Sequence, residues 1–214
     1  DLTLLEREGY VLRTHGGASL SISDSFVEPF ALRKKTNLEA KKYIGKIAAS
    51  LIHNNDTLFI TSSSTCLEFA NHIKPDLRLN ILTNGIPLAH KLSENNNVTV
   101  ECPAGIYNYF HEGIYGKEVK ELISKRYAQY CFTSCNGIDL INGLTFSTDL
   151  DMTLIRACRD NCDQLIVLAD HTKFGMTYYF KTLSIKEIDV IITDQEPAEK
   201  WITYCEENGI TLIY

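Results

Sequence analysis

The chain has 214 residues, is 44% hydrophobic and carries a formal net charge of −6. This length suits one α/β domain with a full hydrophobic core and is marginal for two domains. An acidic chain is a poor electrostatic match for nucleic-acid phosphates, and no apolar run approaches the ~20 residues of a membrane span. The composition therefore argues against direct nucleic-acid binding by this chain and against membrane insertion.

Seven cysteines are scattered along the chain without a paired framework. This odd number, mostly within strand or helix patterns, indicates reduced thiols of a cytoplasmic protein. Cys131/Cys135 and Cys158/Cys162 have a four-residue spacing that could mimic metal ligands, but no His or Cys partner lies beside either pair. We interpret them as small core residues and expect neither a metal nor a cofactor.

The first 53 residues predict a tail followed by a long helix. Residues 1–18 show a short helical pattern ending at Gly9, then an extended segment whose glycine turn leads into a Ser-rich linker. Residues 24–53 carry a long helical signal with Asn37 as a candidate cap. Three lysines, Lys41, Lys42 and Lys46, lie on or beside its polar side, so we expect a solvated face there.

Strand and helix patterns alternate from there to the end of the chain. Strands are predicted at 58–60, 79–82, 98–102, 130–134, 165–169, 188–193 and 210–213. Helices are predicted after Thr65 and at 87–92, 117–127, 151–162 and 197–208, whereas 106–115 is irregular and aromatic and 135–149 is a Gly-rich loop. Alternating, mostly apolar strands predict an α/β fold with a doubly wound, mostly parallel sheet and helices on both faces.

The most informative stretch is TLFITSSSTCLEFA, residues 57–70. A buried strand turns through Ser62, Ser63, Ser64 and Thr65 into a helix, which leaves backbone N–H groups unpaired at the positive end of the helix dipole. Such a turn suits a phosphate, although taken alone an ordinary Ser/Thr cap is the more common explanation. Polar strand ends elsewhere change that balance.

In a doubly wound sheet, ligands bind outside the carboxyl ends of the strands. Four polar strand ends would meet there: 61–65, 83–84, 134–139 and 170–173. Hydroxyls and free N–H groups suit a phosphate, amides and acids suit sugar hydroxyls, and a lysine suits an anion. The candidate phosphate ligands are Ser62, Ser63, Ser64 and Thr65, and the candidate sugar ligands are Thr83, Asn84, Asn136, Gly137, Asp139, Asp170 and Lys173.

Catalytic patterns are weak by comparison. The serines lack the glycines of a nucleophile elbow, and the chain has neither a dinucleotide-binding nor a P-loop motif. His111 and His171 fall in loops near the proposed edge, where surface histidines are more common than catalytic ones. Asp170 or Asp139 with Lys173 could do acid–base work on a sugar, but a strand-end salt bridge is the simpler interpretation.

These motifs together resemble the C-terminal effector-sensing domain of DeoR-type transcriptional regulators. SSSTC matches that family's phosphate loop, TNG its T-N-S strand end, and NGID, GLT and DHTKFG match further motifs in order. DLTLLEREGYVLRTHGGA looks like the end of a winged helix-turn-helix, so residues 1–18 are expected to be wing and linker and residues 19–214 the sensing and oligomerisation domain.

The resemblance implies a fold related to ribose-5-phosphate isomerase and CoA transferases, used as a sensor and not as an enzyme. It implies a sugar-phosphate effector, a homo-oligomer (dimer or tetramer), and operator DNA bound only through an N-terminal domain missing from this chain. A sugar-phosphate isomerase that retains catalysis is the alternative.

Three positions depart from the family pattern. Ser63 replaces the usual glycine of the phosphate loop, Pro103-Ala104-Gly105 replaces a paired glycine, and Asp151 and Ile155 stand where a glutamate and a lysine are frequent. The last departure weakens the case for isomerase chemistry.

Overall fold

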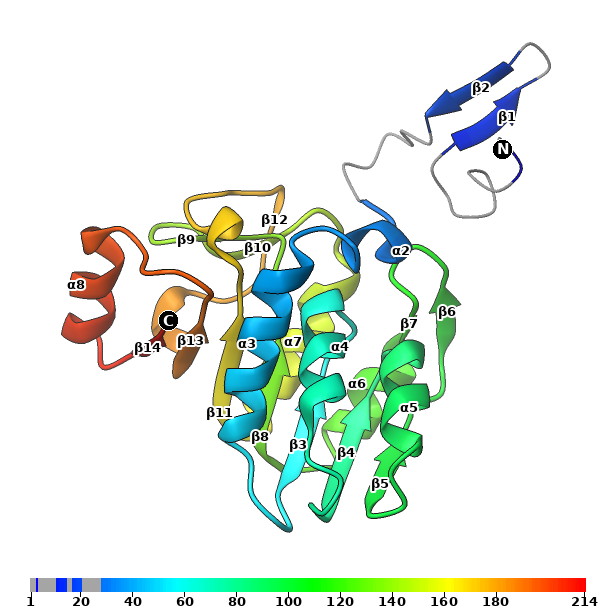
Figure 1. Cartoon of the computed structure of the whole chain (residues 1–214), viewed down its shortest axis with the longest axis horizontal. Coiled ribbons are helices and arrows are strands. Elements are labelled where there is room, and N and C mark those ends of the chain that lie inside the picture. Colours follow the sequence, from blue (N-terminus) through cyan, green and yellow to red (C-terminus); the bar gives the residue numbers. More distant parts are fainter. Residues whose placement is uncertain (1–2, 4–10, 15–16, 21–27) are drawn as a thin grey trace.

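A seven-stranded parallel sheet forms the centre of the computed structural model, which describes residues 3, 11–14, 17–20 and 28–214 (Figure 1). The strand order is β14-β13-β11-β8-β3-β4-β5, with bounds Thr211–Ile213, Val190–Ile192, Cys162–Leu168, Ala128–Thr133, Thr57–Ile60, Leu79–Thr83 and Val98–Glu101. From β3 the chain proceeds outward to β4 and β5, then returns to β8 on the other side. The predicted doubly wound fold is confirmed, with its switch point between β3 and β8.

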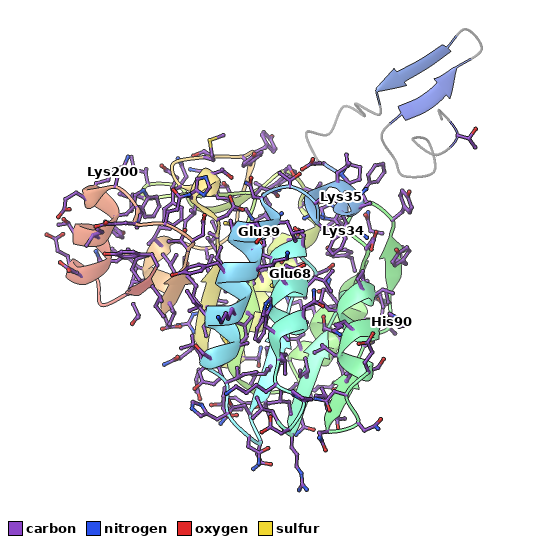
Figure 2. The ribbon with its side chains drawn as sticks, in the orientation of Figure 1. Lys34, Lys35, Glu39, Glu68, His90 and Lys200 are labelled. Carbon is purple, nitrogen blue, oxygen red and sulfur yellow. The ribbon has the colours of Figure 1, made fainter. Side chains whose placement is uncertain are left out.

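Helices cover both faces of this sheet, as the apolar strands require. One face packs against α3 (Leu38–Ser50), α4 (Ser64–His72) and α5 (Ile86–Ser93). The other packs against α6 (Lys117–Ile123), α7 (Leu150–Asp160) and α8 (Glu199–Glu207), and buries Trp201 at 2% exposure. The outer sides of α3 and α4 carry charged residues such as Glu39 and Glu68 (Figure 2).

Helices α3 and α4 pack backbone to backbone. A Cβ at Gly45 would lie 2.6 Å from the carbonyl carbon of Glu68, so only glycine allows this approach. The close contact fixes the position of α4, whose first turn belongs to the serine-rich stretch. Cys131, Cys135 and Cys158 are buried in the core as predicted, and Cys162 packs against it.

Short elements gather over the carboxyl ends of the strands (Figure 1). They are α2 (Phe30–Arg33), the hairpin of β6 (Ile106–Asn108) and β7 (Gly113–Tyr115), the 3₁₀ turn η1 (His171–Lys173), and a sheet of β9 (Gly137–Asp139), β10 (Gly143–Phe146) and β12 (Phe180–Lys181). The segments predicted as irregular (106–115) and as a loop (135–149) are therefore hairpins, each stabilised by antiparallel pairing. A further 3₁₀ turn, η2 (Ile185–Glu187), precedes β13.

The predicted helix over 24–53 is two helices. The chain turns between α2 and α3, where Asn37 has φ 51°, a left-handed conformation that asparagine tolerates better than most residues. The side chain of Asn37 makes no cap hydrogen bond and instead reaches another loop. The start of the predicted helix, residues 24–27, lies outside the described residues.

Near the N-terminus, β1 (Val11–Thr14) and β2 (Gly17–Leu20) pair as an antiparallel hairpin. The expected linker beginning at the glycines is thus partly strand, and β2 runs two residues past the boundary predicted after residue 18. The short helix predicted before Gly9 lies almost wholly outside the described residues. The assignment of residues 1–18 to a wing stays a prediction.

Candidate ligand-binding site

A cavity of about 220 Å³ opens at the carboxyl ends of β3 and β8, at the switch point of the sheet. Its walls come from the segments after β3, β8 and β11, from α7, and from the α2–α3 connection. Pockets for drug-sized ligands measure about 300–1,000 Å³. The cavity therefore suits a small metabolite.

The serine-rich turn forms one end of this cavity. Ser63 is the N-cap of α4, and its hydroxyl accepts a hydrogen bond from Cys66 N–H at 2.9 Å. No acceptor is recorded in the described part of the chain for the N–H groups of Ser63, Ser64 and Thr65. Three donors at the positive end of a helix form a ready anion site. The turn is thus a helix cap that also leaves the kind of N–H groups that an anion site requires.

Lys173 stands at the same end of the cavity. Its ammonium donates to Ser134 Oγ at 2.9 Å and lies 4.0 Å from a carboxylate oxygen of Asp170. Although burial opposes it, the charge of Lys173 and the hydrogen bonds from Thr172 hold the pKa of Asp170 below its ordinary value. Lys173 is therefore held in place by Ser134 while keeping donors for a ligand.

The α2–α3 connection supplies another wall. Lys41 is 4% exposed, and its ammonium donates to the carbonyl oxygens of Arg33 and Thr36, which fastens the end of α2 to α3. Burial, followed by repulsion from Lys173, lowers the pKa of Lys41 to about 8. The amide of Asn37 donates to Asp170 Oδ1 at 3.3 Å and so joins this wall to the segment after β11.

Asp151, Tyr115 and His111 form a buried cluster in a further part of the wall. Tyr115 donates its hydroxyl to Asp151 Oδ1 at 3.2 Å, and His111 Nδ1 lies 3.9 Å from Asp151 Oδ2. Burial raises the pKa of Asp151 to about 6 against the opposing charge of Arg33. Burial, followed by the charge of Arg33, lowers the pKa of His111 to about 4, so at neutral pH the histidine is neutral.

The structure brings some of the predicted site residues to the cavity and leaves others outside it. The wall includes Ser62, Ser63, Ser64, Asn136, Asp170 and Lys173. Thr65, Thr83, Asn84, Gly137 and Asp139 do not line it. The first group comes from three of the four predicted strand ends, those after β3, β8 and β11, whereas the end of β4 does not line the cavity.

The residues outside the wall hold the wall in shape. Asn84 accepts the N–H of Ser62 at 2.8 Å, and Thr83 accepts the N–H of Gly85. A Cβ at Gly137 would lie 2.3 Å from Met176 O, so the backbone passes too closely for any other residue. Asp139 accepts three hydrogen bonds within its own turn, from Ile141 and Asn142. These contacts fit positioning roles, and direct sugar contact by these residues stays a prediction.

The departures from the family pattern have clear positions. Ser63 adopts φ −155° and ψ 157°, an extended conformation open to any residue. Asp151 and Ile155 line the cavity, whereas Pro103-Ala104-Gly105 lies outside its walls.

Sequence reasoning missed several wall residues. Lys41 was expected on a solvated face but is buried, because α2 folds over the start of α3. Arg33 was not singled out, and His111 was interpreted as a surface residue but is 5% exposed. No local signal marks Arg33, because the cavity forms only when α2 returns over the sheet edge.

Two features are absent from the described residues. No group of three or more His, Cys, Asp or Glu side chains there could hold a metal ion. No helix there is both long enough and apolar enough to cross a membrane.

Comparison with known proteins identifies related regulators. The sequence profile of the DeoR C-terminal sensor domain matches residues 36–195. The repressor GlcR of Bacillus subtilis is 32% identical over 213 residues, covering all of this chain and 82% of GlcR. The regulator GolR of Listeria innocua is 34% identical over 199 residues, covering 92% of this chain and 77% of GolR. The L-fucose operon activator of Haemophilus influenzae is 28% identical over 213 residues, covering all of this chain and 85% of the activator.

A solved structure with a TM-score above 0.5 shares the fold. The δ subunit of eIF2B from Chaetomium thermophilum aligns with a TM-score of 0.52 at 21% identity, covering 77% of this chain and 59% of that one. Ribose 5-phosphate isomerase A from Methanocaldococcus jannaschii aligns with a TM-score of 0.49 at 12% identity, covering 65% of this chain and 55% of that one. At this level of identity the alignments carry no inference about chemistry.

Proposed function

The chain belongs to the family of DeoR C-terminal sensor domains, and on that premise we propose that its cavity binds a small sugar phosphate that modulates DNA binding by the full-length regulator. The regulated genes would serve carbohydrate metabolism, as the name of the L-fucose operon activator indicates for that relative.

One observation carries this proposal. Ser63 and Ser64, whose N–H groups have no recorded acceptor among the described residues, line the same small polar cavity as Lys173. A phosphate matches these groups in charge and in its need for several donors. Asn136, Asp170 and the buried Asp151 supply the acceptors and donors that sugar hydroxyls require.

The effector would act by differential affinity. A ligand changes DNA binding only if it prefers one of two conformations of the regulator, and the coupling is reciprocal. Because this chain carries a net charge of −6, we propose that operator contact belongs to a separate N-terminal DNA-binding domain. We further propose that the regulator is a cytoplasmic homo-oligomer, because two-fold symmetry matches paired half-sites in operators.

Catalysis is the competing function, and the relatives argue against it. The relatives named above are regulators, and Lys173 is held by Ser134 beside Asp170 as in a structural pair. If a coupled assay showed that this chain isomerises ribose 5-phosphate, the sensor assignment would be overturned.

The direct test is isothermal titration calorimetry with sugar phosphates and the matching unphosphorylated sugars. We expect binding only when the phosphate is present. Lys173→Ala should weaken that binding by about tenfold or more, because a charged partner of the phosphate is lost. Lys46→Ala, which removes an exposed lysine of α3, is the matched control and should leave binding unchanged. Equal binding of sugars and their phosphates would contradict the proposal.

A further inference from the structure

The wall that α2 contributes to the cavity holds a donor for which no partner is recorded among the described residues. Arg33 donates through Nε to Glu28 O at 3.0 Å, and its guanidinium carbon lies 5.4 Å from the ring centre of Phe30. Its Nη2 is buried and has no hydrogen-bond partner among the described residues. Leaving a charged donor buried and unpaired is costly, so such a group calls for an acceptor from outside the chain.

An open acceptor accompanies this donor in the same wall. Asp151 is 7% exposed and receives the hydroxyl of Tyr115 on Oδ1. Its Oδ2 accepts no hydrogen bond within the described part of the chain, since His111 Nδ1 at 3.9 Å is beyond hydrogen-bond distance. A carboxylate has about four lone-pair sites, so Asp151 can accept further hydrogen bonds from a ligand.

The two ends of the cavity differ in net charge. Lys173 and Lys41 outnumber Asp170, and the start of α4 adds the positive end of a helix dipole. At the other end the charges of Arg33 and Asp151 cancel, and Glu28 adds a negative charge to the wall. One end therefore favours an anion, and the other favours a polar group without charge.

From these contacts we infer that Arg33 and Asp151 hold neighbouring hydroxyl groups at the end of the ligand remote from its phosphate. This inference rests on the proposed function. A hydroxyl donates to the carboxylate and accepts from the guanidinium, so the pair satisfies both halves of its hydrogen-bonding capacity with charge-assisted bonds. The ligand class is a monophosphorylated polyhydroxy compound, and bisphosphates and phosphorylated sugar acids are rejected.

Calorimetry on matched phosphates tests this ligand class. The first series is glucose 6-phosphate, 2-deoxyglucose 6-phosphate and 6-phosphogluconate, the second is ribose 5-phosphate with 2-deoxyribose 5-phosphate, and the third is fructose 1-phosphate with fructose 1,6-bisphosphate. In each series that binds, the parent should bind at least about tenfold more tightly than the acid or bisphosphate and measurably more tightly than the deoxy compound. Equal affinities within a series would overturn the inference.

Variants assign the selectivity to the named residues. Asp151→Asn should lower the affinity for the parent compound. At the same time it should improve the relative affinity for the phosphorylated acid, because the repelling carboxylate is gone. Asp149→Asn makes the same change at an exposed position outside the cavity and should alter neither affinity. A relative gain of the acid cannot result from misfolding, so unchanged selectivity in Asp151→Asn would overturn the inference.

Arg33→Gln tests the donor side. It should lower the affinity for every parent compound by about tenfold or more. Lys34→Gln changes the neighbouring exposed lysine (Figure 2) and should leave these affinities unchanged. Inorganic phosphate serves as a probe of the other end. If it binds in a manner dependent on Lys173 while no sugar phosphate binds more tightly than phosphate itself, the phosphate end stands and this inference fails. If phosphorylation has no effect on any compound, the proposed function fails instead.

Discussion

The two ends of the cavity are built in different ways. The phosphate end, formed by the start of α4 with Lys173, uses main-chain N–H groups that one strand–helix turn leaves open. The remote end takes Arg33 from α2, Asp151 from α7 and His111 from the loop between β6 and β7. The first is a local consequence of backbone geometry, whereas the second exists only after the chain has folded.

Because of this difference, the two ends are suited to control different properties of ligand binding. Main-chain donors cannot be exchanged by ordinary substitution, so the proposed phosphate end would be a constant requirement of binding. Side chains from separate elements can change one at a time, so the remote end is suited to set which sugar is bound. Substitutions that separate backbone from side-chain contributions therefore test the comparison directly.

The largest effect is expected from removing one main-chain donor. Ser64→Pro deletes the N–H at the first position of α4, where proline is tolerated, and the extended conformation of Ser63 is compatible with a following proline. Losing one hydrogen bond to a phosphate should weaken binding about 10- to 100-fold by calorimetry. Ser64→Ala keeps the N–H and should retain most of the affinity. Equal losses in the two variants would show that the hydroxyl, and not the backbone, binds the phosphate.

The second effect concerns the connection between α2 and α3, which forms one wall of the cavity. Lys41→Met leaves the carbonyl oxygens of Arg33 and Thr36 without their ammonium donor and should lower the free energy of unfolding by about 2 kcal/mol in urea denaturation. Lys42→Met removes only a surface pair with Glu39 and should change stability by less than about 0.5 kcal/mol. If both variants are equally stable, Lys41 does not fasten α2 to α3.

The third effect is a pH dependence that arises from Asp151. Asp151 faces Arg33, Tyr115 and His111, and its pKa is about 6. Its carboxylate accepts an additional hydrogen bond from a ligand hydroxyl only when it is ionised. Lowering the pH from 8 to 5 protonates about nine-tenths of it and should weaken binding by up to about tenfold. Asp151→Asn should lose this component, while the titrations of Lys41 and of the ligand phosphate remain in both profiles. Superimposable profiles would contradict a role for the ionised carboxylate.

The same pKa shift has the opposite sign for stability. A carboxyl whose pKa is raised in the folded state binds its proton more tightly there, so Asp151 adds stability below about pH 4 and loses that contribution as the pH rises through about 6. The pKa of His111 is lowered to about 4, so its contribution to the stability of the protein is lost progressively as the pH falls below about 6.5. Acid titration of binding and of unfolding should therefore diverge.

The contrast between the two ends also explains what the sequence could predict. The doubly wound sheet and the serine-rich turn follow from apolar strand patterns and from hydroxyls placed just before a helix, which are local signals. Lys173 was predicted because it follows a strand whose end must lie at the same edge. Arg33 and Lys41 were not predicted as cavity residues, because their burial depends on α2 returning over the sheet edge, and helical periodicity placed Lys41 on a solvated face.

Asn84 and Asp139 show the converse limit. Both were expected as sugar ligands because both follow strands at the ligand-binding edge. In the structure the amide of Asn84 supports Ser62, and the carboxylate of Asp139 closes its own turn. Position at a strand end predicts the neighbourhood of a polar side chain, but not whether that side chain already has a hydrogen-bond partner in the nearby backbone.

The smallest effect is expected at Ser63, the serine that replaces the family's usual glycine. Its hydroxyl caps Cys66 N–H, and glycine at an N-cap costs only a few tenths of a kcal/mol, so Ser63→Gly should lower the unfolding free energy by about that amount. The N–H of residue 63 is retained, so phosphate affinity should change by less than about twofold. Ser63→Ala should cost more stability, about 1 kcal/mol, because alanine is a poorer cap than glycine. A large loss of affinity in Ser63→Gly would mean that the Ser63 hydroxyl itself contacts the ligand, and the phosphate end would then depend on side chains as the remote end does.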